Sequence, residues 1–173
     1  MEGSQTSPAK EPLLKPLLLS HGTVECRDIE AAKRFYTEVL GMEAVRTSKI
    51  SLMLRLNSTT TIAAVQTRGP NGAGHYSHFG LDFATREEVE AAWETLKGVQ
   101  EEYGIRKITR PADQHGTYAF YIEDMDGNWW EFLTNPPAGY SYVFDLEEDD
   151  RAWRDQNMGA DRAERYEQVK KDG

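Results

Sequence analysis

The strongest constraint on the fold is an internal repeat. Residues 20–41 read SHGTVECRDIEAAKRFYTEVLG and residues 77–98 read SHFGLDFATREEVEAAWETLKG. Each copy begins with Ser-His, continues as a short strand pattern, and then shows the three- and four-residue apolar spacing of a helix. The expected helix boundaries are two capping residues and two closing glycines: Asp28, Thr85, Gly41 and Gly98. The repeat predicts two copies of one supersecondary unit.

Strand patterns follow each expected helix. They read MEAVRT, ISLMLRL and TTTIAAVQT after the first helix, and IRKIT, TYAFYIE and NWWEFLT after the second. The pair Asp126-Gly127 predicts a tight hairpin before the last strand. We therefore expect an α+β fold, in which two βαβββ modules form a curved mixed sheet around a cleft, with the helices outside. The expected modules span residues 17–67 and 75–134 of a domain over 17–139.

Composition predicts the flanking segments and the class of partner. Residues 1–16, rich in Ser, Pro, Lys and Glu, predict a flexible tail, and residues 140–173 a polar, partly helical extension. The net charge of −9 argues against nucleic acid or an anionic membrane as partner, which leaves a small molecule. No apolar run reaches the length of a membrane span. Cys26 is alone, so no internal disulfide can form, and we expect a cytoplasmic protein.

The histidine of each repeat lies on a polar strand face. Side chains alternate across a strand, so His21 shares its face with Glu25, and His78 shares its face with Asp82. Such groups in a cleft cost free energy unless something pairs with them, and a metal ion would do so.

Glu131 is the third candidate metal ligand. It lies in the apolar run WWEFL, where a carboxylate needs a partner. Taken alone, Glu131 could pair with an arginine such as Arg106 or Arg110. Taken with the two repeated histidines, it favours a single metal site made of His21, His78 and Glu131, and the cleft is then a metal-containing one.

These features resemble the vicinal oxygen chelate superfamily, which includes glyoxalase I, methylmalonyl-CoA epimerase, fosfomycin-resistance transferases, bleomycin-binding proteins and extradiol dioxygenases. The resemblance rests on the paired modules, the histidine heading each, and the hairpin DMDGNWWE, over residues 17 to 135. It implies metal ligands on the first, fifth and eighth strands, at His21, His78 and Glu131. Glyoxalase-like members also have a glutamate on the fourth strand, where this chain has Ala63. Gln66 is an alternative fourth ligand there.

A further likeness favours the ring-cleaving members. Their tyrosine ten residues before the carboxylate ligand matches Tyr121, and a nearby proton-moving residue matches His115. Two histidines and one carboxylate suit Fe(II), although Mn(II), Zn(II) or Ni(II) fit the same set. The resemblance implies a non-haem Fe(II) dioxygenase-like enzyme acting on a phenolic or polyketide-like aromatic. Four side chains are expected as walls for a flat ligand: Trp129, Tyr118, Phe120 and Met53. Unlike this chain, extradiol enzymes usually have two tandem domains.

Two alternative functions stay open. One is a glyoxalase-like lyase, isomerase or epimerase with a non-redox metal, in which Glu25 or Asp82 serves as the base. The other is a non-catalytic protein that binds and sequesters a small molecule. Single-domain members of the superfamily usually dimerise, so a homodimer that completes the cleft across subunits is also expected.

Overall fold

The first module forms a four-stranded sheet with one helix. The computed structural model describes residues 12–14, 16–56, 60–68, 74–114 and 117–135. The elements are β1 (Gly22–Cys26), α1 (Ile29–Arg34), a π-helical turn η1 (Phe35–Val39), β2 (Glu43–Ser48), β3 (Ser51–Arg55) and β4 (Thr61–Gln66). The strand order is β1-β4-β3-β2, with β1 parallel to β4 and the other pairs antiparallel.

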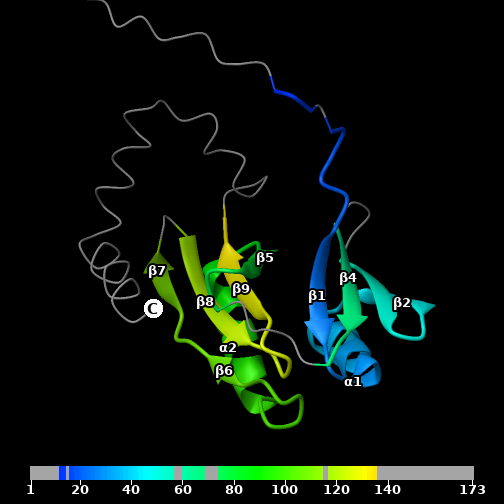
Figure 1. The fold of residues 1–173 in the computed structure, drawn as a ribbon. Helices are drawn as coiled ribbons and strands as arrows, with labels where there is room; N and C mark the ends of the chain where they lie inside the picture. Colours follow the sequence, from blue (N-terminus) through cyan, green and yellow to red (C-terminus); the bar gives the residue numbers. More distant parts are fainter. Residues whose placement is uncertain (1–11, 15, 57–59, 69–73, 115–116, 136–173) are drawn as a thin grey trace, which may run out of the picture.

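The second module repeats this plan. It comprises β5 (His78–Phe83), α2 (Arg86–Gly98), β6 (Lys107–Ile108), β7 (Ala112–Gln114), β8 (Thr117–Glu123) and β9 (Trp129–Thr134). Its strand order is β5-β9-β8-β6, and β7 also pairs with β8. The α+β fold with two related modules is therefore confirmed. The strands form two separate sheets, one in each module, which lie apart in Figure 1.

The expected helix starts are confirmed by their caps. The Asp28 carboxylate accepts hydrogen bonds from the backbone N–H groups of Glu30 (2.8 Å) and Ala31 (3.0 Å). Thr85 and Glu88 form a reciprocal capping box at the start of α2. Gly41 follows η1 with φ of +66°. Gly98 is instead the last helical residue of α2, because the chain continues through a turn before it reverses. Neither helix of the described residues is long and apolar enough to cross a membrane.

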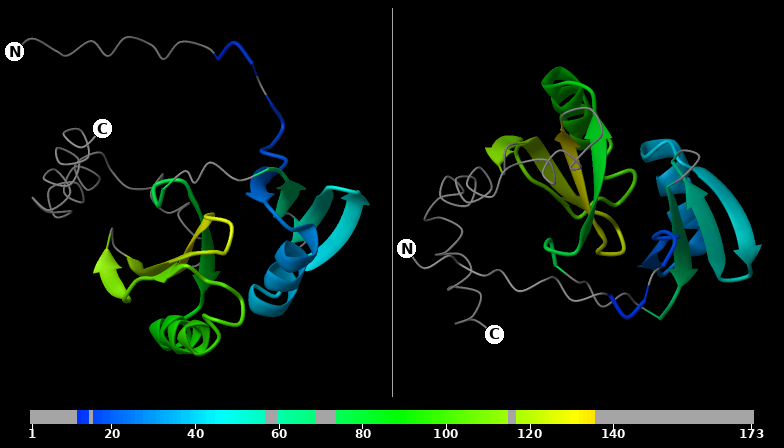
Figure 2. Two further views of the ribbon diagram at one scale, coloured as in Figure 1. Left: turned by 60° about the horizontal axis from the view of Figure 1, so that its bottom comes forward. Right: turned by 90° about the horizontal axis from the view of Figure 1, so that it is seen from above.

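The two modules share one hydrophobic core. The expectation that both helices lie outside the sheets is wrong for α1: with turn η1 it lies between the two sheets, because Tyr36 packs against the second module (Figure 2). The buried ring of Tyr36, on η1, meets Trp130 on β9 edge-on, with ring centroids 5.6 Å apart. The core cluster runs from Val24 and Phe35 in the first module to Ile122 in the second. Burying this shared apolar surface stabilises the arrangement of the modules.

A glycine lets the first strands of the two modules approach each other. A Cβ atom built on Gly22 would lie only 2.7 Å from Cε1 of Phe79 and 2.9 Å from its Cζ. Any larger residue at position 22 would therefore push the Phe79 ring away. Because Gly22 and Phe79 touch, the two sheets face each other through the sides that carry these two residues.

The predicted hairpin at Asp126-Gly127 is confirmed, and its residues join the modules. Gly127 has φ of +95°, and its N–H donates to the carbonyl of Asp124 (3.1 Å). The fully buried Asp124 carboxylate accepts from the Tyr36 hydroxyl (3.3 Å) and the Trp130 indole N–H (3.2 Å). Asn128 donates to the carbonyl of Glu25 on β1 (3.0 Å). The hairpin of the second module is thus bonded to both β1 and η1 of the first.

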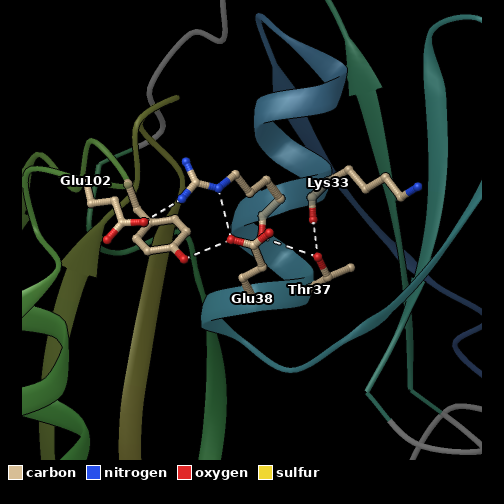
Figure 3. Close-up of polar contacts among 6 residues, drawn as sticks. Lys33, Thr37, Glu38 and Glu102 are labelled. Carbon is tan, nitrogen blue, oxygen red and sulfur yellow. Dashed lines mark hydrogen bonds and ion pairs between the residues drawn. The ribbon is translucent and has the colours of Figure 1, made fainter.

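A second polar contact joins the modules at the surface. The guanidinium of Arg34 bonds Glu38 on η1 (2.9 Å) and Glu102 after α2 (2.5 Å), and it lies over the Tyr103 ring. The Tyr103 hydroxyl in turn donates to Glu38 (2.8 Å). Figure 3 shows Glu38 and Glu102 reaching toward this shared cluster from opposite modules. Exposed pairs of this kind contribute little to stability individually.

The one cysteine of the chain is enclosed at this junction. Cys26, at the end of β1, is fully buried. Burial raises the pKa of its thiol to about 11, and the carboxylates of Asp126, Asp28 and Asp124 add to the effect. A thiol with so high a pKa is a poor nucleophile near neutral pH.

We predict that Asp124→Ala strongly destabilises the protein. The change removes the acceptor of the Tyr36 and Trp130 hydrogen bonds and leaves these buried donors unpaired, which should cost about 3 kcal/mol or more. Chemical denaturation measures this loss. Glu43→Ala is the control, because the Glu43 side chain is 71% exposed in its pair with Arg55 and should cost less than about 1 kcal/mol. Equal losses in both variants would contradict the role given to Asp124.

Candidate metal centre

Two of the three predicted metal ligands lie together on the second sheet. His78 Nε2 is 3.2 Å from Glu131 Oε2, and the Tyr121 hydroxyl donates to Glu131 Oε1 at 2.7 Å. The strand register produces this cluster, because Glu131 pairs with Gly80 on one side and with Tyr121 on the other. The side chains of His78, Glu131 and Tyr121 project from the face of the sheet opposite α2. Phe120, the residue just before Tyr121 on β8, packs in the core on the other face.

The ring of His78 is held in a ligand-like orientation. Its Nδ1–H donates to the backbone carbonyl of His75 (2.6 Å), which leaves Nε2 directed at Glu131. Metal-binding histidines usually have such a second hydrogen bond. The hydrogen bond to Glu131 is the main cause that raises the pKa of His78. A proton and a metal ion would therefore compete for the same nitrogen.

The carboxylate of Glu131 is buried, and its strand β9 lies between β5 and β8. Glu131 is 4% exposed, so its charge is largely shielded from water. The nearest atoms to a Cβ built on Gly80 would be Leu133 Cδ2 (3.3 Å) and Glu131 Oε2 (3.9 Å). A side chain at position 80 would thus stand beside the carboxylate, and glycine leaves that space free for a ligand. One nitrogen and one oxygen that converge in this way fit a divalent metal ion.

His21, the third predicted ligand, does not join this group within the chain. Among the residues that the structure describes, no three His, Cys, Asp or Glu side chains are grouped to hold one ion. Gly22 and Phe79 face each other across the modules, and neighbouring residues of a strand point to opposite faces. His78 begins β5 and projects opposite to Phe79, whereas His21 lies one residue before β1, outside the regular strand. His21 Nδ1 lies 2.7 Å from the hydroxyl oxygen of Ser20.

Gln66, the arginines considered as partners of Glu131, and His115 are the other residues predicted at or near the site. Gln66 donates its side-chain amide to the carbonyl of Arg27 (2.7 Å) and shares its strand face with the buried Ile62, so it points to the helix side. Of the two arginines considered as partners of Glu131, Arg106 pairs instead with Glu123 (2.9 Å). His115 lies outside the described residues.

The structure corrects two of the four expected ligand walls. Phe120 is fully buried and stacks on Phe132, with centroids 4.8 Å apart, and the Tyr118 hydroxyl donates to Glu90 of α2. Both residues face α2, away from Tyr121. Strand alternation already implies this, since 118 and 120 cannot share a face with 121. Trp129 lies two residues before Glu131 on β9 and therefore on the same face of the sheet, whereas Met53 lies on the first sheet.

Two positioning residues were not predicted from the sequence. Thr109 accepts a hydrogen bond from the backbone N–H of Tyr121 on its side-chain oxygen (2.8 Å) and so anchors β8 at the site. Asn135 donates its amide to the Asp82 carboxylate (2.8 Å). These residues lie far from their partners in the sequence, and no spacing rule links them.

Comparison with known proteins identifies the family. The glyoxalase/bleomycin resistance protein/dioxygenase superfamily model matches residues 18–132, and the chain belongs to this superfamily. A trivalent organoarsenical cleaving enzyme of Bacillus sp. (strain MD1) is 27% identical over 118 residues, which cover 66% of this chain and 71% of that enzyme.

Solved structures share the fold. The fosfomycin resistance protein FosX of Listeria monocytogenes has a TM-score of 0.59 at 18% identity, covering 76% of this chain and 100% of FosX. The bleomycin resistance determinant encoded on transposon Tn5 has a TM-score of 0.52 at 18% identity, covering 68% and 98%. FosX has also been crystallised with Mn(II) and sulfate; that structure has a TM-score of 0.59 at 19% identity and covers 75% of this chain and 99% of FosX.

We predict that metal affinity rises with pH through the titration of His78. Below the raised pKa of His78, each pH unit should increase the apparent affinity for Zn²⁺ by at least about tenfold, because His78 must lose its proton when the ion binds, and this contribution should level off above that pKa. Calorimetry between about pH 5 and 8 measures this. His75→Ala is the control, since it keeps the carbonyl that orients His78. A flat profile in the wild-type protein would exclude His78 as a ligand.

Proposed function

We propose that this protein is a metal-dependent oxygenase, and that His78, Glu131 and a His21 side chain hold one divalent ion. Fe(II) is the favoured ion, and the proposed substrate is a phenolic or polyketide-like aromatic. The supporting observation is the cluster in which His78 and Tyr121 both bond the buried Glu131 carboxylate. When bound, Fe(II) would supply a Lewis acid with open coordination positions and access to redox chemistry.

The residues around the site would orient the ligands and donate hydrogen bonds. The Tyr121 hydroxyl, bonded to Glu131 Oε1, directs the second carboxylate oxygen toward His78. If that hydrogen bond to Glu131 is released, the same hydroxyl could donate to an oxygen of a substrate. His115 remains our candidate for moving a proton during the reaction.

We further propose that the site is completed by His21 from a second copy of the chain. Among the described residues, His21 is not grouped with His78 and Glu131 within one copy, and the outer edges of β1 and β5 carry no paired strand among the described strands. The residues just before His21 form an exposed apolar arm: Leu13, Leu14, Leu17, Leu18 and Leu19. Such an arm is costly in water, and a second copy that receives His21 would also cover the arm. A symmetric dimer would then hold two equivalent sites.

A lyase or isomerase with a redox-inert metal is the second candidate. The likeness to FosX, which was crystallised with Mn(II), favours this reading over a protein that only sequesters a ligand. Glu25 or Asp82 would then supply the base. This candidate needs no dioxygen, so oxygen consumption separates it from the oxygenase.

The organoarsenical cleaving relative suggests a third class of substrate, which the residues here fit poorly. Trivalent arsenic is a soft centre that prefers thiolate ligands. This sequence has one cysteine, Cys26, which is buried and has its pKa raised to about 11. A pair of thiolates is therefore not available in the chain, and an oxygen-chelating substrate fits the site better.

We predict that the anaerobically purified protein holds about one iron per chain and consumes oxygen when a suitable catechol or hydroquinone is added. Glu131→Gln should lose both properties, because the amide cannot replace the anionic ligand. Metal analysis and an oxygen electrode measure these outcomes. Activity with Mn²⁺ or Zn²⁺ and no oxygen uptake would overturn the oxygenase proposal in favour of the lyase or isomerase.

The shared site predicts that two inactive variants rescue each other. His21→Ala and His78→Ala should each lose metal binding alone. If subunits exchange at random, about half of the dimers in an equimolar mixture are mixed, and each of these has one intact site, so about one quarter of the wild-type binding should return. Isotope-labelled metal bound after co-refolding measures the recovery. No recovery, with dimers formed normally, would contradict a site shared between copies.

A further inference from the structure

The two sheets differ in burial on their matching faces. Along β3 and the first four residues of β4, buried residues alternate with more exposed ones, so only the helix side of the first sheet is covered. Along β9 of the second sheet, every residue from Trp129 to Leu133 is buried. A strand that is buried at consecutive positions is covered on both faces. The face of the second sheet that carries Glu131 is therefore covered as well.

Residues at matching positions in the two modules show the same contrast. In the strand order of the two sheets, β8 and β9 correspond to β3 and β4. Ala119 pairs with Leu133 across β8 and β9, and Ser51 pairs with Val65 across β3 and β4. Ala119 is 0% and Leu133 1% exposed, whereas Ser51 and Val65 are only partly buried. Because neither Ala119 nor Leu133 belongs to the core cluster, both must be buried by residues outside it.

Among the described residues, the helical elements that pack on the second sheet lie on its other face. Helix α2 packs on β8 and β9, and Tyr36 of η1 meets Trp130, on the side where Phe132 belongs to the core. At the end of β9, the side-chain oxygen of Asn135 is also enclosed, although it has no hydrogen-bond partner among the described residues. The burial is a property of one copy of the chain, so the covering residues belong to that same copy.

The C-terminal segment 136–173 is the part of the chain that fits this face. It follows Asn135 directly, at the edge of the covered surface. The other segments outside the described residues contain a single apolar side chain larger than proline, that of Met1. Ten extended residues span about 33 Å, so the first half of the segment is long enough to cross the whole sheet face. This half contains the large aromatic side chains of Tyr140, Tyr142, Phe144 and Trp153.

We propose that residues 136–173 pack over the face of the second sheet that carries Glu131 and so cover the candidate metal centre. The aromatic side chains of the segment contact Ala119 and Leu133. A metal ion, a substrate or His21 from a second copy then reaches the centre only when the segment moves aside. This inference goes beyond the proposed function, because it concerns access to the site and does not depend on which metal or reaction the site supports.

Two introduced cysteines test whether the face is covered. Ala119→Cys places a thiol on this face, and Ser51→Cys places one at the matching position of the first sheet. The native Cys26 is buried, and its pKa of about 11 makes it slow to react. In the full chain, we expect N-ethylmaleimide to modify Ala119→Cys at least about tenfold more slowly than Ser51→Cys, since a covered thiol reacts only when its cover opens. Mass spectrometry measures both rates.

A change within the segment tests whether the segment is the cover. The four-serine variant of the full chain combines Tyr140→Ser, Tyr142→Ser, Phe144→Ser and Trp153→Ser. In this background, Ala119→Cys should react at least about tenfold faster than before, whereas Ser51→Cys should change by less than about twofold. Each thiol is compared with itself, so a difference in intrinsic reactivity between the two positions does not matter. Thermal melting verifies folding, and Phe144→Ser alone is a milder variant that should accelerate Ala119→Cys in part.

Metal-binding rates test the effect of the cover on the candidate centre. In the four-serine variant, Zn²⁺ should bind, and be removed by a chelator, at least about threefold faster than in the wild-type protein, because both steps need an open face. Stopped-flow measurements with a zinc-sensitive dye follow both steps.

The outcomes distinguish this inference from the proposed function. Equal alkylation rates of Ala119→Cys and Ser51→Cys in the otherwise wild-type chain would overturn the proposal. A slow rate that both the four-serine variant and Phe144→Ser leave unchanged would exclude residues 136–173 as the cover. Faster alkylation with unchanged Zn²⁺ rates would overturn the control of access to the centre. Failure of the wild-type protein to bind Zn²⁺ would overturn the proposed metal site, and the alkylation rates would still decide whether the segment covers this face.

Discussion

The close contact between Gly22 and the Phe79 ring governs how the two modules meet. Because the contact admits no side chain at position 22, β1 and β5 approach through their helix-side faces. The apolar residues of both sheets then enclose α1 and η1 in one core. In the arrangement that this contact supports, His21 is not grouped with His78 and Glu131 within the described part of one chain.

Buried polar groups complete this arrangement. A carboxylate such as Asp124 is tolerated in the core only because several donors from different elements reach it, among them Tyr36 and Trp130. Glu131 differs in kind, since its partners His78 and Tyr121 lie on one face of the second sheet. Two buried carboxylates, Asp124 and Asp126, thus serve the junction of the modules, whereas Glu131 bonds residues of its own sheet. The hydrogen-bond donors that the surrounding protein provides to Asp124 and to Glu131 distinguish the roles of these two carboxylates.

Local rules explain how much of this could be predicted from the sequence. Alternation along β5 and β9, the caps at Asp28 and Thr85, and the turn at Gly127 each depend on a few neighbouring residues, and these predictions are confirmed. The adjacency of His78 and Glu131 follows from the repeat together with the parallel pairing of β5 with β9. The relative placement of the modules depends on long-range contacts such as Gly22 with Phe79, which no short pattern encodes. For that reason the sequence could bring His78 next to Glu131 but could not locate His21 relative to them.

Because Cys26 is buried at the junction between the modules, its thiol can report how often that junction opens. The thiol lies at the end of β1, where the backbone of Arg27 bonds to Asp126 of the hairpin (3.0 Å), so a reagent can reach it only when that region opens. The rate at which the folded protein is alkylated would then report how often the modules part. Since the chain has no other thiol, the opening of this junction can be followed without a label or an engineered site.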